Sequence, residues 1–193
     1  LEMDYDDNEW LQDIRKQTRR LSELIQELVF LSRMEEKGNQ YQMIDFPITD
    51  ILEETAQSFA SLAVTQGQTF TVQIQPMLSY YGDVKTIHRL AVILLDNALK
   101  YSDEKGNITI SLEKADRALR LPVHNTCAPI TSEDIKHLFE RFYRSDKSRN
   151  SQTGGYGIGL SIAKAIVTAH NGTIRATTKD GHSLTVTAMF PQK

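Results

Sequence analysis

A glycine-rich turn that runs directly into a helix pattern constrains this chain more than any other feature. Residues 153–160 read Thr-Gly-Gly-Tyr-Gly-Ile-Gly-Leu, with four glycines within six residues. Glycine tolerates positive φ and has no side chain to keep a ligand away from the backbone. Such a turn at the start of a helix points unpaired N–H groups and the positive end of the helix dipole at one spot, which suits a phosphate. The alternative is a flexible hinge before a core helix.

The turn matches neither of two common nucleotide-binding motifs. No βαβ pattern surrounds it, which excludes a dinucleotide fingerprint, and no Gly-Lys-Ser/Thr follows, which excludes a Walker loop. The residues after the turn have an apolar spacing close to 3.6, so they are expected to form a helix with one buried face. These apolar residues are Leu160, Ile162, Ala163, Ile166, Val167 and Ala169.

Residues 7–36 are predicted to form one long amphipathic helix. Its apolar stripe is three positions wide per heptad, which is typical of a bundle-facing helix rather than a narrow two-stranded seam. Such a helix cannot bury its stripe alone and needs a partner segment or another copy of the chain. Residues 15–20 carry a basic turn, interpreted as a solvated face, with a docking patch as the alternative. The stripe comprises Leu11, Ile14, Thr18, Leu21, Leu24, Ile25, Leu28, Leu31 and Ser32.

The rest of the chain predicts a mixed α+β domain. Thr49 and Asp83 are expected to cap helices at about 50–65 and up to residue 101, and a shorter helical stretch is expected at 132–142. Alternating apolar residues predict strands, and the polar segment 142–152 predicts a mobile loop. We therefore expect a two-layer α/β sandwich, with helices on one face of a mainly antiparallel sheet, preceded by the long helix. The expected strands are 41–46, 69–75, 80–82, 108–112, 119–123, 172–178 and 183–190.

One face of the third predicted helix carries polar side chains with a distinct chemistry. Asn97, Lys100 and Tyr101 are spaced i, i+3, i+4 and therefore share that face. An amide oxygen suits Mg²⁺, a lysine neutralises phosphate charge, and a tyrosine ring can stack on a base. The alternative is that Asn97 caps a neighbouring loop while the other two side chains reach solvent.

Composition excludes several classes of protein. The net charge is −3, so no bulk attraction to nucleic acid or to anionic lipid is expected. The single cysteine, Cys127, excludes an internal disulfide framework and fits a reducing compartment. The longest apolar run, Leu90–Leu95, is far shorter than a membrane span.

In order and spacing, these motifs resemble the catalytic, ATP-binding domain of sensor histidine kinases, in the superfamily that includes gyrase and the large heat-shock chaperones. Residues 94–102 are similar to the N box, 139–149 to the F box and ATP lid, and 155–160 to the second glycine box of that family. Residues 7–36 are similar to the second helix of the dimerisation and phosphotransfer hairpin. The resemblance implies a Bergerat-type ATPase fold and divides the chain into 1–40, which holds that helix and a linker, and 41–193, the ATP-binding domain.

The resemblance also implies roles for individual residues. Asn97 would coordinate Mg²⁺, Lys100 would contact phosphate oxygens, and Tyr101 would flank the adenine of ATP. The glycine box would supply backbone N–H groups and close approach, and lid cations would contact phosphate. The residues carried over in these last two roles are Gly155, Gly157, Gly159 and Leu160, with Arg144, Lys147 and Arg149 on the lid.

Three departures from the family pattern concern binding and catalysis. Ile93 stands one turn before Asn97, where the family usually has a polar or acidic residue. The first glycine box has Asn125 in place of Asp, which keeps an acceptor for the adenine amino group but loses the charge. Cys127 and Pro129 replace two of its glycines. A charge-assisted hydrogen bond exceeds a neutral one by about 1 kcal/mol, so weaker ATP binding is expected. No histidine has the sequence context of a phosphoacceptor, and His170 is expected to be structural.

The resemblance implies part of a bacterial two-component sensor histidine kinase that uses Mg²⁺ and ATP, phosphorylates a histidine outside this chain and relays the phosphoryl group to a response regulator. The whole protein would be a homodimer through the helical hairpin, and this part would lie in the cytoplasm with any membrane anchor elsewhere. One alternative is a degenerate module that signals by docking or dimerisation without turnover. Another is a switch kinase that phosphorylates serine, which the long helix and residues 139–144 disfavour.

Overall fold

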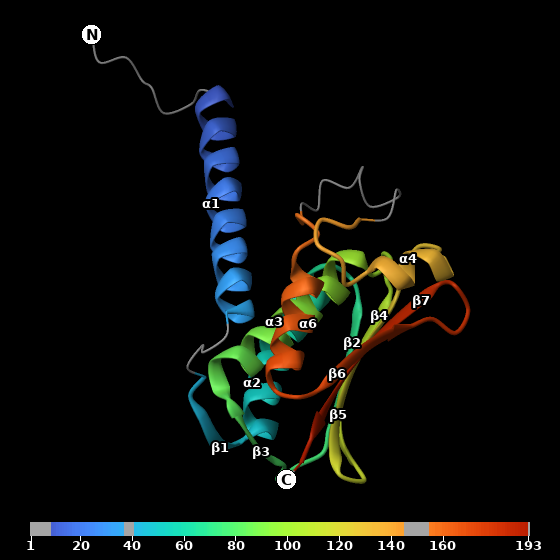
Figure 1. Cartoon of the computed structure of the whole chain (residues 1–193). Coiled ribbons are helices and arrows are strands. Elements are labelled where there is room, and N and C mark those ends of the chain that lie inside the picture. The colour runs from blue at the N-terminus through green and yellow to red at the C-terminus, as the bar shows by residue number, and fades with distance from the viewer. Residues whose placement is uncertain (1–8, 37–40, 145–154, 193) are drawn as a thin grey trace.

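The computed structural model describes residues 9–36, 41–144 and 155–192, and Figure 1 shows how the elements are arranged. The helices are α1 (Glu9–Glu35), α2 (Ile48–Thr65), α3 (Val84–Tyr101), α4 (Ser132–His137) and α6 (Gly159–Ala169). The strands are β1 (Met43–Pro47), β2 (Thr69–Ile74), β3 (Ser79–Asp83), β4 (Asn107–Ala115), β5 (Ala118–Thr126), β6 (Thr173–Thr177) and β7 (Ser183–Pro191).

A five-stranded sheet forms one layer of the fold. Its strand order is β2-β4-β5-β7-β6, and only the β2–β4 pair is parallel. Helices α2, α3 and α6 cover one face of this sheet, while β1 and β3 form a separate antiparallel pair (Figure 1). Alternate residues of β5, such as Leu119, Leu121 and Val123, are buried against the helical layer. The predicted two-layer α+β fold with a mainly antiparallel sheet is confirmed.

Helix α3 is the central helix of the buried layer, and its first turn is fixed by Asp83. The Asp83 carboxylate accepts hydrogen bonds from the backbone N–H groups of Thr86 and Gln42, each at 2.9 Å. Burial on its own would raise the pKa of Asp83, but these hydrogen bonds outweigh it and the net pKa is lowered. The predicted N-cap is therefore confirmed, and it also ties α3 to the segment before β1.

The prediction that Thr49 caps α2 is wrong. Pro47 occupies the N-cap position and Thr49 lies inside the first turn, where it is buried. Its hydroxyl donates to the carbonyl oxygen of Gln75 at 2.9 Å and accepts from the N–H of Leu78 at 3.1 Å. The hydroxyl thus satisfies the backbone of the β2–β3 connection instead of its own helix, a pairing that only the tertiary fold creates.

The short helix α4 ends earlier than the predicted 132–142. It stops at His137, and Phe142 takes a left-handed conformation with φ of 63°. This conformation turns the chain back so that Phe142 can donate its N–H to the carbonyl oxygen of Gly157 at 2.9 Å. The predicted loop 142–152 lies outside the described residues from position 145 onward.

His170 at the end of α6 is buried and neutral. Its Nδ1–H donates to the carbonyl oxygen of Ile166 at 2.8 Å, and its Nε2 accepts the backbone N–H of Asp83 at 3.1 Å. Burial lowers the pKa of His170, and this arrangement needs only the uncharged imidazole. The residue therefore has the structural role that the sequence predicts.

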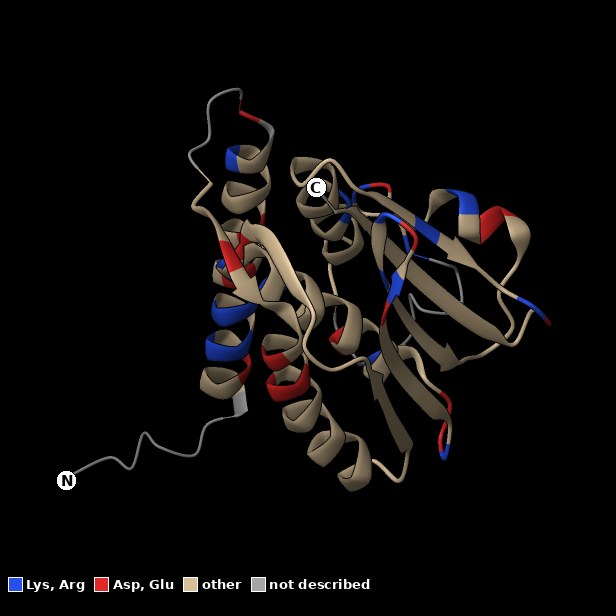
Figure 2. Cartoon of the chain, turned by 90° about the horizontal axis from the view of Figure 1, so that it is seen from below, with Lys and Arg blue, Asp and Glu red and all other residues tan. Residues whose placement is uncertain are grey.

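Helix α1 is covered by the domain at its C-terminal half only. Leu31 is 2% exposed and packs into the core together with the partly buried Leu24 and Leu28. The neighbouring stripe stays in contact with solvent; its members are Leu11, Ile14, Leu21, Ile25 and Val29. Figure 2 shows Lys and Arg in successive turns of the N-terminal half of α1. Among the described residues, no helix is both long and apolar enough to cross a bilayer.

Candidate functional site

A cavity of about 410 Å³ lies beside α3 and the N-terminal end of α6. We name it the α3–α6 cavity. Among the site residues predicted from the sequence that the structure describes, all but Asn125 lie in its wall. The predicted residues in the wall are Asn97, Lys100, Tyr101, Arg144, Gly155, Gly157, Gly159 and Leu160. The helix face and the glycine turn, far apart in the sequence, therefore meet at one cavity.

The polar face of α3 forms one side of the α3–α6 cavity. Its opposite face is buried through Leu94, Leu95 and Ala98, which fixes the rotation of the helix and turns Asn97 toward the cavity. The Lys100 ammonium forms an ion pair with the Asp96 carboxylate at 2.6 Å, one turn away. A ligand phosphate at Lys100 would therefore approach an ammonium that already has a carboxylate beside it.

The glycine turn needs glycine at position 157 for two reasons. Gly157 has a φ of +71°, in the left-handed region that favours glycine. A Cβ at this position would stand 2.6 Å from the carbonyl oxygen of Tyr143 and 2.9 Å from the carbonyl carbon of Phe142. The glycine turn and residues 142–143 therefore pack backbone against backbone.

The turn leads into an α6 whose first residues have no side-chain cap. Ile158 occupies the N-cap position, and no side chain of the described residues accepts a hydrogen bond from this end of the helix. The N–H groups of the first turn and the positive end of the dipole are consequently available to an anion in the adjoining cavity.

Three residues that depart from the family pattern lie in the cavity wall, namely Ile93, Cys127 and Pro129. Burial, together with the nearby charges of Asp103 and Asp180, raises the pKa of the Cys127 thiol to about 11. This cysteine is thus a protonated, packed side chain and a poor nucleophile.

Asn125 is placed differently from Cys127. It is 2% exposed, does not line the α3–α6 cavity, and its amide nitrogen donates to the carbonyl oxygen of Thr126 at 3.0 Å. Its predicted contact with a base remains a prediction. Lys147 and Arg149 lie outside the described residues.

Helix α1 contributes to the cavity wall two carboxylates that were not predicted from the sequence. Glu23 and Glu27 both line the α3–α6 cavity, although they belong to the helix before the sheet domain. Burial raises the pKa of Glu27, and the positive charges of Arg89 and Lys100 only partly offset this effect. No local pattern could have identified these residues, because their place depends on how α1 packs against the domain.

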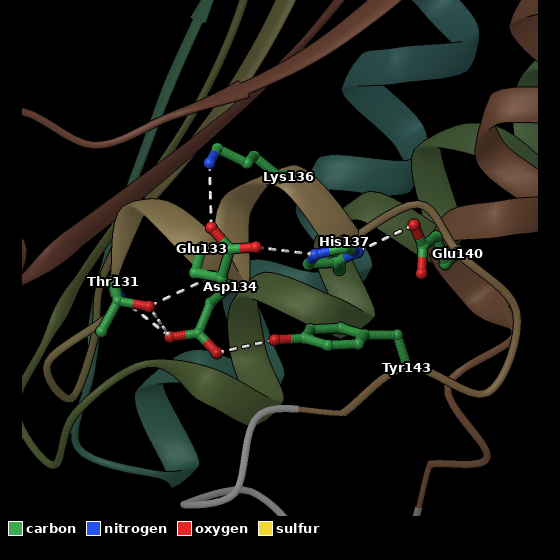
Figure 3. Close-up of polar contacts among 7 residues, drawn as sticks. All are labelled: Thr131, Glu133, Asp134, Lys136, His137, Glu140 and Tyr143. Carbon is green, nitrogen blue, oxygen red and sulfur yellow. Dashed lines mark hydrogen bonds and ion pairs between the residues drawn. The ribbon is translucent and has the colours of Figure 1, made fainter.

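A polar cluster around α4 holds the chain at Tyr143, close to the end of the described segment 41–144 (Figure 3). The hydroxyl of Tyr143 donates to the Asp134 carboxylate at 2.8 Å, and its ring lies against that of His137 with 5.5 Å between centroids. Both ring nitrogens of His137 lie near carboxylate oxygens, Nδ1 at 2.8 Å from Glu140 and Nε2 at 3.0 Å from Glu133. Because carboxylates only accept hydrogen bonds, both contacts together require the protonated imidazolium.

The His137 cluster predicts a local pH dependence. The hydrogen bonds to Glu140 and Glu133 raise the pKa of His137 above its ordinary value of 6.5. Its stabilising contribution is therefore fully present below pH 6.5 and is lost as the pH rises through the higher folded-state pKa. We expect amide hydrogen exchange, corrected for its intrinsic pH dependence, to accelerate over residues 132–143 across that range, together with the His137 titration seen by NMR.

The Glu140→Gln variant provides the control for this pH dependence. It removes the larger of the two contributions to the raised pKa and should move both transitions to lower pH. If the exchange transition stayed at the same pH in this variant, the local opening would not depend on the protonation of His137, and the prediction would be contradicted.

An uncapped helix N-terminus and an amide-bearing helix face meet at one cavity of this α+β sandwich, an arrangement that suits a phosphate-bearing ligand such as a nucleotide. The sequence profile of the family described as "Histidine kinase-, DNA gyrase B-, and HSP90-like ATPase" matches residues 82–193. The chain belongs to this family, and the resemblance inferred from its motifs is confirmed.

Proteins with similar sequences include sensor proteins and sensor kinases. The chain is 34% identical to sensor protein DltS of Streptococcus agalactiae serotype III (strain NEM316) over 176 residues, which cover 91% of this chain and 44% of DltS. The chain thus spans less than half the length of this relative.

Two solved structures share the fold. Full-length ShkA in complex with AMPPNP matches with a TM-score of 0.84 and 17% identity, over 99% of this chain and 40% of ShkA. Histidine kinase ThkA in complex with the response regulator protein TrrA matches with a TM-score of 0.77 and 20% identity, over 100% of this chain and 53% of that chain. At these identities, the likeness establishes the fold alone.

Proposed function

We propose that this chain is the ATP-binding, catalytic part of a bacterial two-component sensor histidine kinase. It would transfer the γ-phosphoryl group of ATP to a histidine on a hairpin helix outside these 193 residues. The observation that carries the proposal is the meeting of Asn97 and the Gly157 turn at one cavity. An amide oxygen, an ammonium and an uncapped helix end around one cavity suit a metal-bound polyphosphate.

The cavity residues would each contact a different part of the nucleotide. Tyr101 would flank the adenine, Lys100 and Arg144 would contact phosphate oxygens, and the glycine turn would donate backbone N–H groups. Lys147, on the lid, is a further candidate for phosphate contact. Catalysis in this arrangement is mainly positioning and neutralisation of charge.

The donor chemistry of the cavity fits magnesium held jointly by protein and nucleotide. Asn97 would give one oxygen ligand, since Mg²⁺ usually takes one or two protein oxygens and completes its shell with phosphates and water. Within residues 9–36, 41–144 and 155–192, no group of three or more His, Cys, Asp or Glu side chains could hold a metal by itself. Bound magnesium would withdraw charge from the phosphates, and Asn97 would fix where it sits.

The division into 1–40 and 41–193 is part of the same proposal. Residues 1–40 would hold the second helix of the dimerisation hairpin and its linker. The exposed apolar stripe of α1, from Leu11 to Val29, supports this, because a helix of this kind needs a partner that the described residues do not provide. In the whole protein the partners would be the first hairpin helix and a second copy of the chain.

In the whole protein, this chain would work with a response regulator and would lie in the cytoplasm. A response regulator would receive the phosphoryl group, as is consistent with the structure of the related ThkA bound to the response regulator protein TrrA. We place this part of the protein in the cytoplasm, with any membrane anchor elsewhere in the whole protein and with no nucleic-acid partner.

Nucleotide binding is the direct test of the proposal. The melting temperature should rise with increasing Mg²⁺-ATP or Mg²⁺-ADP as mass action requires. A hairpin peptide that carries the acceptor histidine should then gain acid-labile label from [γ-³²P]ATP when this chain is present, and none without it. No thermal shift at millimolar nucleotide would instead favour a module that signals by docking, and binding without transfer would limit the proposal to nucleotide recognition.

A further inference from the structure

The carboxylates of α1 lie where the polyphosphate of a nucleotide is expected to bind. Glu23 and Glu27 line the α3–α6 cavity together with Asn97 and Lys100, the residues assigned above to metal and phosphate. The family profile matches only residues 82–193, so α1 lies outside the part of the chain that it covers. The cavity is therefore completed by a segment that the nucleotide-binding family does not itself define.

Packing holds α1 in this place through contacts close to Glu27. Leu31 is almost fully buried in the core, and the guanidinium carbon of Arg89 lies 3.7 Å from the centre of the Phe30 ring. The positive charge of Arg89, on α3, also acts on Glu27 and lowers the pKa of its carboxyl group, against the larger effect of burial. The Glu27 carboxylate thus sits on a docked helix surface rather than on a freely moving one.

The described wall of the α3–α6 cavity contains more carboxylates than cations. Its acidic residues are Glu23, Glu27, Asp96 and Asp103, and its basic residues are Lys100 and Arg144. Lys100 is already paired with Asp96 at 2.6 Å. A polyphosphate entering this wall meets like charges, and water screens the half-buried Glu27 less than Glu23, whose side chain is 60% exposed and lies 3.6 Å from the Arg19 guanidinium.

We propose that Glu23 and Glu27 are charge-discriminating residues, through which docked α1 weakens nucleotide binding in proportion to the negative charge on the phosphates. The inference rests on the proposed function and adds to it a dependence of affinity on the position of α1. By linkage, a bound polyphosphate disfavours the docked helix as much as the docked helix disfavours the polyphosphate. Movement of α1 away from α3 would then raise affinity for the most highly charged nucleotide most.

The test compares the dissociation constants of AMP, ADP and ATP for the wild-type chain and for Glu27→Gln, by calorimetric titration without divalent metal and at low salt. The variant removes one charge and keeps the shape of the side chain. We expect its affinity for ATP to rise about three- to tenfold, for ADP by less and for AMP least. Near 1 M salt, where the screening length falls to about 3 Å, the difference should largely disappear.

Asp13→Asn is the matched control. It makes the same change of charge on the same helix, about 20 Å further along at 1.5 Å per residue, and should leave all three affinities unchanged. An equal gain for the three nucleotides with Glu27→Gln would mean that the substitution alters packing and not charge discrimination, and would overturn the inference. No gain at all would overturn it too, while the proposed function would stand as long as the wild-type chain binds nucleotide. Failure of the wild-type chain to bind any nucleotide, with magnesium as well as without it, would overturn both.

Discussion

Replacing Gly157 with alanine is expected to destabilise the domain and to weaken nucleotide binding by roughly tenfold or more. A non-glycine residue at a φ of +71° costs about 1–2 kcal/mol on its own. The added Cβ would also meet the Tyr143 carbonyl oxygen at 2.6 Å, so the backbone must shift and strain the hydrogen bond from Phe142 to the turn. Urea denaturation measures the first effect and titration with Mg²⁺-ADP the second.

Gly159→Ala controls for loss of glycine in the same turn. A Cβ at Gly159 would lie 3.5 Å from the Ile93 side chain, an ordinary contact, and alanine is the better helix former. The stability of this variant should be unchanged or higher by about 0.5–1 kcal/mol. If Gly157→Ala unfolded at the same urea concentration as the wild-type chain, the close packing of the turn against residues 142–143 would be contradicted. The titration is made at a temperature where circular dichroism reports a folded variant.

The features that could be predicted from the sequence are those with local causes. Asp83 caps α3 because its carboxylate reaches an N–H three residues on, and this needs no knowledge of the rest of the fold. Asn97 and Lys100 share a helix face because of the helical repeat alone, and the buried residues on the other side fix the direction of that face. The glycine turn is likewise marked by its composition.

The features that could not be predicted depend on contacts between distant segments. Thr49 has the chemistry of an N-cap, but its hydroxyl is used by Gln75 and Leu78 across a separate connection. Glu27 carries no local mark that separates it from the other charges of an amphipathic helix. It becomes part of the site only because Leu31, one turn further on, is buried in the core of the domain.

Replacing Asn97 with alanine is expected to give the largest loss of function without a loss of stability. Alanine is a better helix former than asparagine, and Asn97 lies on the cavity side of α3, so the fold should tolerate the change. Loss of a group that only supports a metal ligand costs about 10–100-fold in metal affinity. Loss of a direct oxygen ligand should therefore weaken Mg²⁺-ATP binding by about 100-fold, the upper end of that range.

The condition that isolates this role of Asn97 is the presence or absence of magnesium. With EDTA, wild-type and Asn97→Ala chains should bind ATP with similar affinity, because the amide is proposed to act through the metal. Asn97→Asp retains an oxygen donor and should lose less Mg²⁺-ATP affinity than Asn97→Ala. An equal loss with and without magnesium would show that Asn97 contacts the nucleotide directly, and no loss in either condition would remove it from the site. The magnesium dependence thus ties the helix face recognised in the sequence to a specific task in the cavity.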